Sequence, residues 1–422
     1  MRERQDRPHP LRIRQAERLL RHAVSRLEKH YPAEELLSSA NEQLARVKRV
    51  QSKFIDALKF AEKAVALDPF SASKIRELGL AHFGLANYDQ AEQQLRRSFA
   101  LDPSNPMTLR YIGFMLFARG EELTNREDRR SEWRKGIETL GQAIDLAEDV
   151  SARGELHFWS ARAHGALMEY DSAKKRYQMA RALGHFPSEC YLCLGENDIQ
   201  QDLFEWAERH LRDALQEILK AKRAALPKAR PDSSTNWWRT PQKSANGSDV
   251  PPGYFLLRVC LLLALVVAER GRDVARARRK LGFVHRHLKF LGKPQPTAER
   301  DELRDFENRR LEIAARYEDY LGWICHLDNQ PRQAREHVEA SVKMRAEPEN
   351  LHHLARIYLD QSLMDRAQDC CRRAREADIE GVYSARIAKI EAEVNRRRNA
   401  DAESPRAAVE GDLQEISDAG NR

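Results

Sequence analysis

The sequence predicts an all-α protein built from repeated helix pairs. Charged residues make up 32% of the chain and aromatic residues only 7%, and there are 19 glycines, a composition that favours helices over sheets. With 422 residues, the chain is longer than a single hydrophobic core usually supports. Its small and apolar residues also recur at a step of 34 residues. These observations together indicate a thin core that continues along an array of small units.

The first expected element is a helix over 11–30. Apolar residues such as Leu11, Leu19, Leu20 and Leu27 follow a helical spacing there. We expect this helix to cover the apolar face that the first repeat would otherwise expose.

The clearest repeat unit runs from Ala72 to Asn105. Its first helix carries apolar or small residues at spacing i, i+3, i+4, i+7, its second helix carries small residues on one face, and a proline ends it. These residues are Ile75, Leu78, Gly79 and His82 in the first helix, Ala91, Leu95 and Ser98 in the second, and Pro103 at the end.

The same pattern recurs elsewhere in the sequence. A step of 34 residues joins Ala57 to Ala91 and Ala173 to Ala207, and a step of 33 joins Ala334 to Ala367. Over about 40–380, this pattern of small residues resembles the tetratricopeptide repeat family. The resemblance implies a right-handed superhelical α-solenoid of about eight helix-turn-helix repeats, with N- and C-terminal capping helices.

Two units depart from the pattern. The third contains an insertion near 121–134. The sixth lacks the Leu-Gly pair and uses the apolar run Phe255–Ala268 as its first helix. This run is too short to span a membrane and contains Arg258.

The expected domain organisation has six parts. They are a basic arm and capping helix (1–37), a first solenoid half of about five repeats (38–221), a flexible basic linker (222–253), a second half of about three repeats (254–380), a C-terminal capping helix (381–398) and a disordered acidic tail (399–422).

The net charge of +7 is unevenly distributed. Residues 1–30 hold nine basic and four acidic residues, and 220–243 hold seven basic and one acidic residue. Residues 399–422, in contrast, hold two basic and six acidic residues. The basic segments could bind nucleic acid or acidic proteins, although a charged helix face is more often simply solvated.

The sequence contains no combination of residues that is typical of a catalytic site. There is no phosphate-binding, dinucleotide-binding or metalloprotease motif, and Cys190-x-x-Cys193 lacks the second pair that a structural zinc site needs. We therefore expect a protein that is not an enzyme and has no cofactor and no metal site. We interpret the six cysteines as small core or surface residues in a reducing compartment, and the absence of a signal peptide also favours the cytoplasm.

The resemblance implies that certain positions of each first helix line a concave binding groove. Arginine and aromatic side chains at these positions suit an acidic and apolar peptide segment. The family's carboxylate clamp wants asparagine where this chain has Arg46 and Leu80, so that specific activity is not implied. The expected groove residues are Arg46, Arg49, Arg76, Leu80, Phe83, Arg110, Phe114, Phe117, Phe158 and Arg162, and the second half contributes a less coherent set, Arg316, Asp319, Trp323, His326, His352, Arg356 and Asp360.

A second candidate motif is Trp237-Trp238 followed by Arg239, inside the basic linker. These tryptophans could dock back onto the solenoid, form a short motif for another protein, or stack on a single-stranded base.

Three functions fit these features. The first is a non-enzymatic adaptor that binds another protein in its concave groove. The second is a regulatory or inhibitory subunit that wraps an effector enzyme or a secretion component. The third is a nucleic-acid-associated protein that uses the basic arm and linker. No membrane partner is expected, and the oligomeric state stays open.

Overall fold

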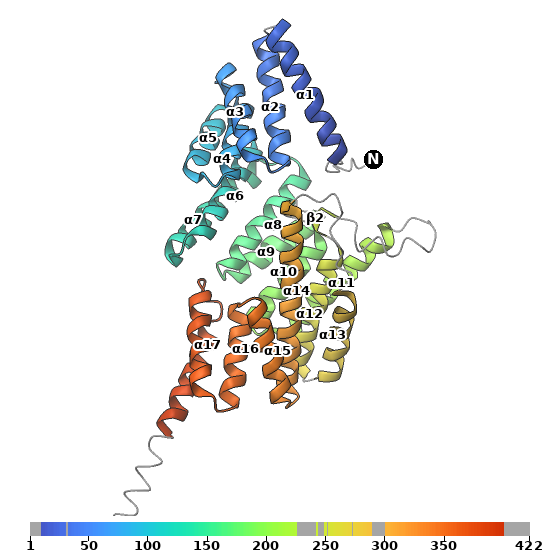
Figure 1. Cartoon of the computed structure of the whole chain (residues 1–422), viewed down its shortest axis with the longest axis vertical. Helices are drawn as coiled ribbons and strands as arrows, with labels where there is room; N and C mark the ends of the chain where they lie inside the picture. Colours follow the sequence, from blue (N-terminus) through green and yellow to red (C-terminus); the bar gives the residue numbers. More distant parts are fainter. Residues whose placement is uncertain are drawn as a thin grey trace, which may run out of the picture. The chain divides into compact units, whose positions relative to one another are not determined.

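Consecutive helices of the computed structural model pack against each other in pairs (Figure 1). The structure describes residues 10–30, 33–225, 242–243, 249–250, 252–271, 273–288 and 300–400. Within them, eight such pairs run from α2 with α3 to α16 with α17, in agreement with the predicted all-α solenoid. Contacts divide the chain into two compact units, Met1–His185 and Phe186–Arg422.

The first unit contains four helix pairs preceded by one additional helix. Its helices are α1 (Pro10–His30), α2 (Glu34–Val50), α3 (Phe54–Leu67), α4 (Ala72–Gly84), α5 (Tyr88–Leu101), α6 (Pro106–Glu122), α7 (Arg126–Leu146), α8 (Val150–Ala166) and α9 (Tyr170–Ala182).

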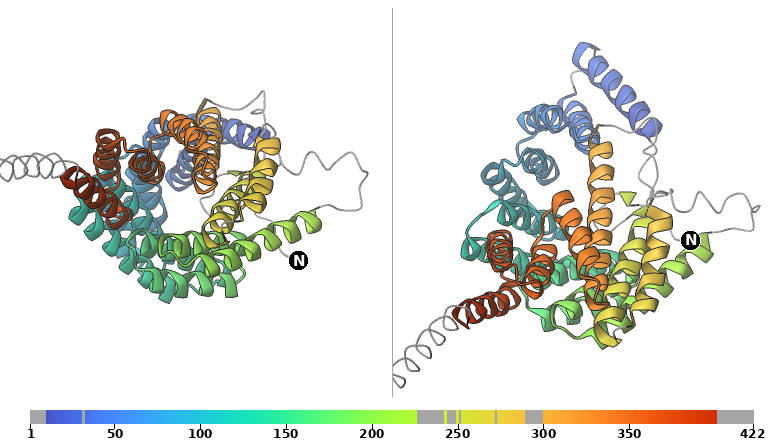
Figure 2. Two further views of the ribbon diagram at one scale, coloured as in Figure 1. Left: turned by 90° about the horizontal axis from the view of Figure 1, so that it is seen from below. Right: turned by 60° about the horizontal axis from the view of Figure 1, so that its bottom comes forward.

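The second unit contains the other four pairs, which Figure 2 shows from two further directions. Its elements are α10 (Pro187–Gln200), α11 (Phe204–Ala225), the antiparallel strands β1 (Gln242–Lys243) and β2 (Asp249–Val250), α12 (Pro252–Gly271), α13 (Val274–Leu288), α14 (Arg300–Leu327), α15 (Pro331–Met344), α16 (Pro348–Asp360), α17 (Met364–Ala377) and a last helix over 384–400.

The repeated alanines mark where the two helices of a pair meet. A side chain no larger than a methyl group lets the second helix approach the first closely, and any larger group would have to push the helices apart. All six alanines joined by the repeat step are 0% exposed: Ala57, Ala91, Ala173, Ala207, Ala334 and Ala367.

The boundary between the units differs from the expected one. The sequence suggested that 222–253 divides the solenoid, but the helices on either side of this segment, α11 and α12, belong to one core. Leu211 and Ile218 on α11 lie in the same buried cluster as Leu257 and Leu261 on α12. The apolar face of α11 is thus covered by α12, and the array of pairs continues across the segment.

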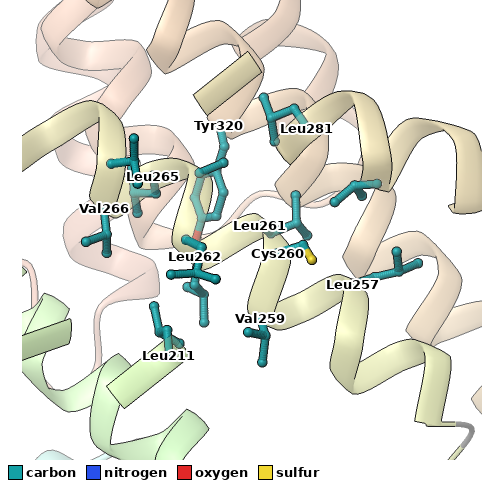
Figure 3. Close-up of a cluster of buried hydrophobic side chains, with 14 of the residues drawn as sticks. Leu211, Leu257, Val259, Cys260, Leu261, Leu262, Leu265, Val266, Leu281 and Tyr320 are labelled. Atoms are coloured by element: carbon teal, nitrogen blue, oxygen red, sulfur yellow. The ribbon is translucent and has the colours of Figure 1, made fainter. Parts of the chain in front are cut away.

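Helix α12 explains why the apolar run Phe255–Ala268 has no Leu-Gly pair. Nearly every side chain of this run is buried, on all sides of the helix. Figure 3 shows Leu211, Leu281 and Tyr320, from α11, α13 and α14, around the leucines and valines of α12. A helix that is apolar around its whole circumference is expected where neighbours surround it.

The insertion near 121–134 lengthens two helices instead of forming a long loop. Helices α6 and α7 have 17 and 21 residues, and their additional turns pack on each other. Trp133 is 8% exposed and its indole Nε1 donates to the carbonyl oxygen of Phe117 at 3.1 Å. Arg119 joins the same region to α5 through Glu92, with an Nη1–Oε2 distance of 2.8 Å.

The Glu17 carboxylate of helix α1 holds this helix against α2 through hydrogen bonds. Glu17 accepts hydrogen bonds from Lys48 Nζ at 2.7 Å and from Gln51 Nε2 at 2.9 Å. Burial acts to raise the pKa of Glu17, but these bonds and the Lys48 charge outweigh it and lower the pKa from 4.5 to about 2. A lowered pKa stabilises the docked helix above pH 4.5, and this stabilisation is lost as the pH falls toward about 2.

We therefore expect Glu17→Gln to loosen α1 at neutral pH. Its backbone amides should exchange faster than in the unmodified chain, and the difference should shrink as the pH falls from 4.5 to about 2. Glu28→Gln, an exposed position on the same helix, is the matched control and should leave exchange unchanged. Equal exchange in both variants at neutral pH would contradict the role of Glu17.

Candidate partner-binding surfaces

The expected groove residues lie on the first helices of four successive pairs. These helices are α2, α4, α6 and α8. They carry Arg46 and Arg49 (α2), Arg76, Leu80 and Phe83 (α4), Arg110, Phe114 and Phe117 (α6), and Phe158 and Arg162 (α8).

Two of these residues belong to the core and cannot line a groove. Leu80 is 3% exposed and Phe158 is 2% exposed. The Phe158 ring lies edge-on to Tyr177 of α9, with 5.7 Å between centroids, so it faces the partner helix of its own pair. Phe117 also packs inward, because a Cβ on Gly136 of α7 would lie 2.4 Å from its ring.

The arginines of α2 are held by a carboxylate of this chain. Arg46 Nε lies 3.2 Å from Glu77 Oε1, and Arg49 Nε lies 3.1 Å from Glu77 Oε2. The Glu77 side chain is 4% exposed, so the two ion pairs tie α2 to α4. Arg76 donates to Ser73 Oγ at 3.4 Å on its own helix.

Further along the unit, two neighbouring aromatic rings with an arginine on either side join α6 to α8. Arg110 lies over the Phe114 ring at 5.2 Å, and the rings of Phe114 and Trp159 are 5.0 Å apart. Arg162 lies over Trp159 at 5.1 Å. We call Arg110, Phe114, Trp159 and Arg162 the Arg–aromatic column. Its members are only partly buried or, in the case of Arg162, exposed.

Glu155 and His185 lie beside Arg110 in a partly buried setting. Its Nη2 donates to Glu155 Oε1 at 2.5 Å, while burial raises the pKa of the Glu155 carboxyl. Burial, reinforced by the Arg110 charge, lowers the pKa of His185 to about 4, so this imidazole is neutral at pH 7. Cations that lie above aromatic rings suit a ligand that is both acidic and apolar.

The second unit contains a cavity of about 370 Å³ on the first helices of its pairs. Helices α10, α12, α14 and α16 each contribute side chains to it. We call it the arginine cavity, and Figure 3 labels two of its wall residues, Leu262 and Tyr320. Its lining consists of Glu196, Ile199, Gln200, Arg258, Leu262, Arg316, Tyr320, Glu347, Pro348, Glu349 and Tyr383.

Ionic side chains face one another across this cavity. Arg258 Nη2 lies 2.6 Å from Glu196 Oε1, and the Tyr320 hydroxyl donates to Glu349 Oε1 at 3.2 Å. Burial acts to lower the pKa of Arg258, but Glu196 raises it well above the ordinary value, so the guanidinium stays charged. Burial raises the pKa of the Glu349 carboxyl, and Arg316 opposes this only in part.

A buried ion pair lies on α14 and α16. His353 Nδ1 lies 3.0 Å from Asp319 Oδ1, and both side chains are less than a tenth exposed. The His353 ring stacks on Trp323 at 4.4 Å, and Trp323 Nε1 donates to Glu269 at 2.5 Å.

Solved structures provide the comparison with known proteins. No protein-family model and no curated protein matches the sequence. The chain is similar to a tetratricopeptide repeat protein from Parabacteroides merdae ATCC 43184, with 13% identity over 76% of this chain and 98% of that chain and a TM-score of 0.48. It is also similar to a chain of the APC/C hetero-tetramer Cut9-Hcn1 (14% identity, 90% and 59% covered, TM-score 0.44) and to Pseudomonas aeruginosa pilF (15% identity, 64% and 96% covered, TM-score 0.41).

Tetratricopeptide repeat proteins are among the structures that this chain resembles in its fold. At these identities the likeness concerns the fold alone. Within the described ranges, no cluster of His, Cys, Asp or Glu could hold a metal ion, and no helix is long and apolar enough to cross a membrane. Trp237, Trp238 and Arg239 lie outside the described residues, as does all but the beginning of the acidic tail.

Sequence reasoning missed Trp159 and the arginine cavity. Trp159 lies one position after the expected Phe158 and three before Arg162, so it shares a helix face with Arg162. The signal for the cavity was Arg258, the single charge in the apolar run Phe255–Ala268. A charge inside a buried helix needs a partner or a polar cavity.

Proposed function

We propose that this protein is a non-enzymatic cytoplasmic adaptor that holds a segment of a partner protein against the Arg–aromatic column. The observation that carries the proposal is the column itself. Two cations and two aromatic rings lie side by side on the first helices of neighbouring pairs, and they retain exposed surface. Aromatic and arginine side chains of this kind dominate the energy of protein interfaces.

The column also indicates the chemistry of the partner. Arg110 and Arg162 attract carboxylates, while the Phe114 and Trp159 rings bury apolar side chains at a small cost in conformational entropy. Glu155 neutralises Arg110 from one side, at an Nη2–Oε1 distance of 2.5 Å. A segment that alternates acidic and apolar residues would satisfy both types of group.

Recovery of the partner from the native host tests this proposal. With Arg110→Glu/Phe114→Ala, the affinity for the recovered partner should fall about tenfold or more, because a central anchor is truncated and a charge is reversed. Arg96→Glu is the matched charge reversal on the second helix α5, where the Arg96 side chain is 63% exposed, and it should bind normally.

Two results would contradict the proposal. One is equal recovery of the same partner by the double variant and by Arg96→Glu. The other is binding that collapses between low and moderate salt, which is the behaviour of phosphate contacts and would favour nucleic acid. A contact anchored by aromatic rings should lose little over the same range.

A further inference from the structure

Helix α13, the second helix of its pair, carries more positive charge than its surroundings offset. Its sequence, VARARRKLGFVHRHL, contains arginine and lysine at five positions and no aspartate or glutamate. Arg276 and Arg278 form ion pairs with carboxylates of other segments. The described part of the chain offers no such pair to Arg279, Lys280 or Arg286.

A buried carboxylate beside this helix is already shared by three arginines. Glu208 on α11 accepts hydrogen bonds from Arg212 of the same helix and from Arg270 Nη1 at 2.8 Å, and it lies 3.7 Å from Arg276 Nη2. The Glu208 side chain is 7% exposed, whereas the arginine side chains are 43–52% exposed. Glu205 lies 3.4 Å from Arg270 Nη2 and neutralises that arginine. Arg212 and Arg276 are left to share one negative charge.

Lys280 brings a further cation to the same place. Burial lowers the pKa of the Lys280 amine, and the charges of Arg276 and Arg212 lower it further. Like charges held together in this way repel one another in the free protein, and a bound anion relieves that repulsion.

We call these five unneutralised cations the basic surface. It lies on the second helices α11 and α13 of two successive pairs, whereas the Arg–aromatic column and the arginine cavity lie on first helices. Its members are Arg212, Arg276, Arg279, Lys280 and Arg286.

The side chains exposed on α13 indicate which class of anion fits. They are Ala275, Arg279, His285 and Arg286, and no large apolar group is among them. Protein interfaces depend on buried aromatic or apolar anchors, and surface binding to a membrane depends on apolar side chains that enter the lipid. Contacts to a phosphate backbone need cations alone.

We propose that the basic surface binds the phosphate backbone of a nucleic acid without regard to its base sequence. The guanidinium forks of Arg212 and Arg276 match pairs of phosphate oxygens, and Lys280 adds a point charge one helical turn from Arg276. Arg279 and Arg286 lie on one face of α13, two turns and about 10 Å apart, and extend the contact to further phosphates. This site is separate from the partner-binding surface proposed above.

The test uses the full-length chain and a fluorescein-labelled oligothymidylate of about 20 nucleotides, with fluorescence anisotropy as the readout. Five phosphate contacts on a single strand predict that the affinity falls about a hundredfold between about 50 and 200 mM salt. Polyglutamate of equal charge and vesicles that contain anionic lipid should both bind more weakly. When the oligonucleotide carries 4-thiothymidine, ultraviolet light should cross-link it to peptides of α11 and α13 in the unmodified chain.

Variants separate this surface from the other basic segments. Arg279→Gln/Arg286→Gln should weaken oligonucleotide binding about tenfold or more and make the salt dependence shallower by two contacts. Arg332→Gln/Arg372→Gln removes the same charge from the second helices α15 and α17, where these side chains are 86% and 61% exposed, and should bind normally. Both variants retain the basic segments 1–30 and 220–243, so a difference between them belongs to α13.

The two proposals fail separately, because Arg110→Glu/Phe114→Ala should bind the oligonucleotide normally. Absence of binding, an equal loss in the two arginine-to-glutamine variants, or cross-links confined to residues outside α11 and α13 would overturn the nucleic-acid proposal. Tighter binding of polyglutamate would assign the surface to an acidic protein, and tighter binding of the vesicles would assign it to a membrane, so either result would overturn it as well.

Discussion

Replacing His353 with leucine is expected to lower the free energy of unfolding of the second unit by about 3–5 kcal/mol. The substitution leaves the Asp319 carboxylate, 3% exposed, without the imidazole that lies 3.0 Å from it. A buried, ionised carboxylate loses its hydration, and without the imidazole it has no ion pair to compensate for that loss. Native-state hydrogen exchange of α14 and α16 measures the change.

The same pair predicts a pH dependence. Burial acts to lower the pKa of His353, but Asp319 outweighs it and raises the pKa above 6.5. A raised pKa contributes stability that is complete below pH 6.5 and is lost as the pH rises through the raised value. Other charges also face this ring, since Glu349 and Glu269 raise its pKa further. Unfolding of the unmodified chain should show this loss, and His353→Leu should not.

Two controls separate the buried pair from a general effect of removing histidine. His337→Leu removes a half-exposed partner of Glu318, and the expected cost is below about 1 kcal/mol. The double variant Asp319→Leu/His353→Leu should be more stable than His353→Leu alone, because no charge is left buried. If the single and double variants are equally destabilised, the cost comes from packing against Trp323 and not from the lone carboxylate.

The fold was predictable because its main constraint is local and repeats. Two helices can approach closely only if a small residue lies at a fixed place in each pair. Ala91 and Ala207 occupy this place and are fully buried, so the repeat is visible in the sequence itself. The boundary between the compact units was not predictable in the same way. It depends on whether α11 and α12 share a core, and the composition of the segment between them carries no information about that packing.

The candidate sites could be predicted only in part from the sequence. Arg110, Phe114 and Arg162 were expected on the groove side, but the expected Phe158 is buried against α9, and its neighbour Trp159 completes the column instead. The arginine cavity depends on which helices become neighbours. Glu196, Arg258 and Arg316 are far apart in the sequence, and no spacing rule connects them before the pairs are stacked.

Replacing Gly322 with alanine is expected to lower the free energy of unfolding of the second unit by about 3 kcal/mol, the upper part of the usual range for overpacking. A Cβ at this position of α14 would lie 2.5 Å from Val338 Cγ2 and 2.8 Å from the carbonyl oxygen of Ala334, both on α15. The side chain of Val338 could rotate, but the carbonyl oxygen is backbone and can move only if α15 moves. Since Val338 is 0% exposed in the core of this pair, that movement opens the packing around it.

Gly282→Ala is the matched control in the same unit. Gly282 lies inside helix α13, and a Cβ there would meet nothing within 4 Å. Alanine restricts the unfolded chain more than glycine does, so this variant should be more stable by up to about 1 kcal/mol. Opposite signs for the same chemical change would show that the contact between helices, and not helix propensity, determines the effect. A loss of stability at both positions would instead mean that α13 also depends on a close approach, contrary to the open space around Gly282.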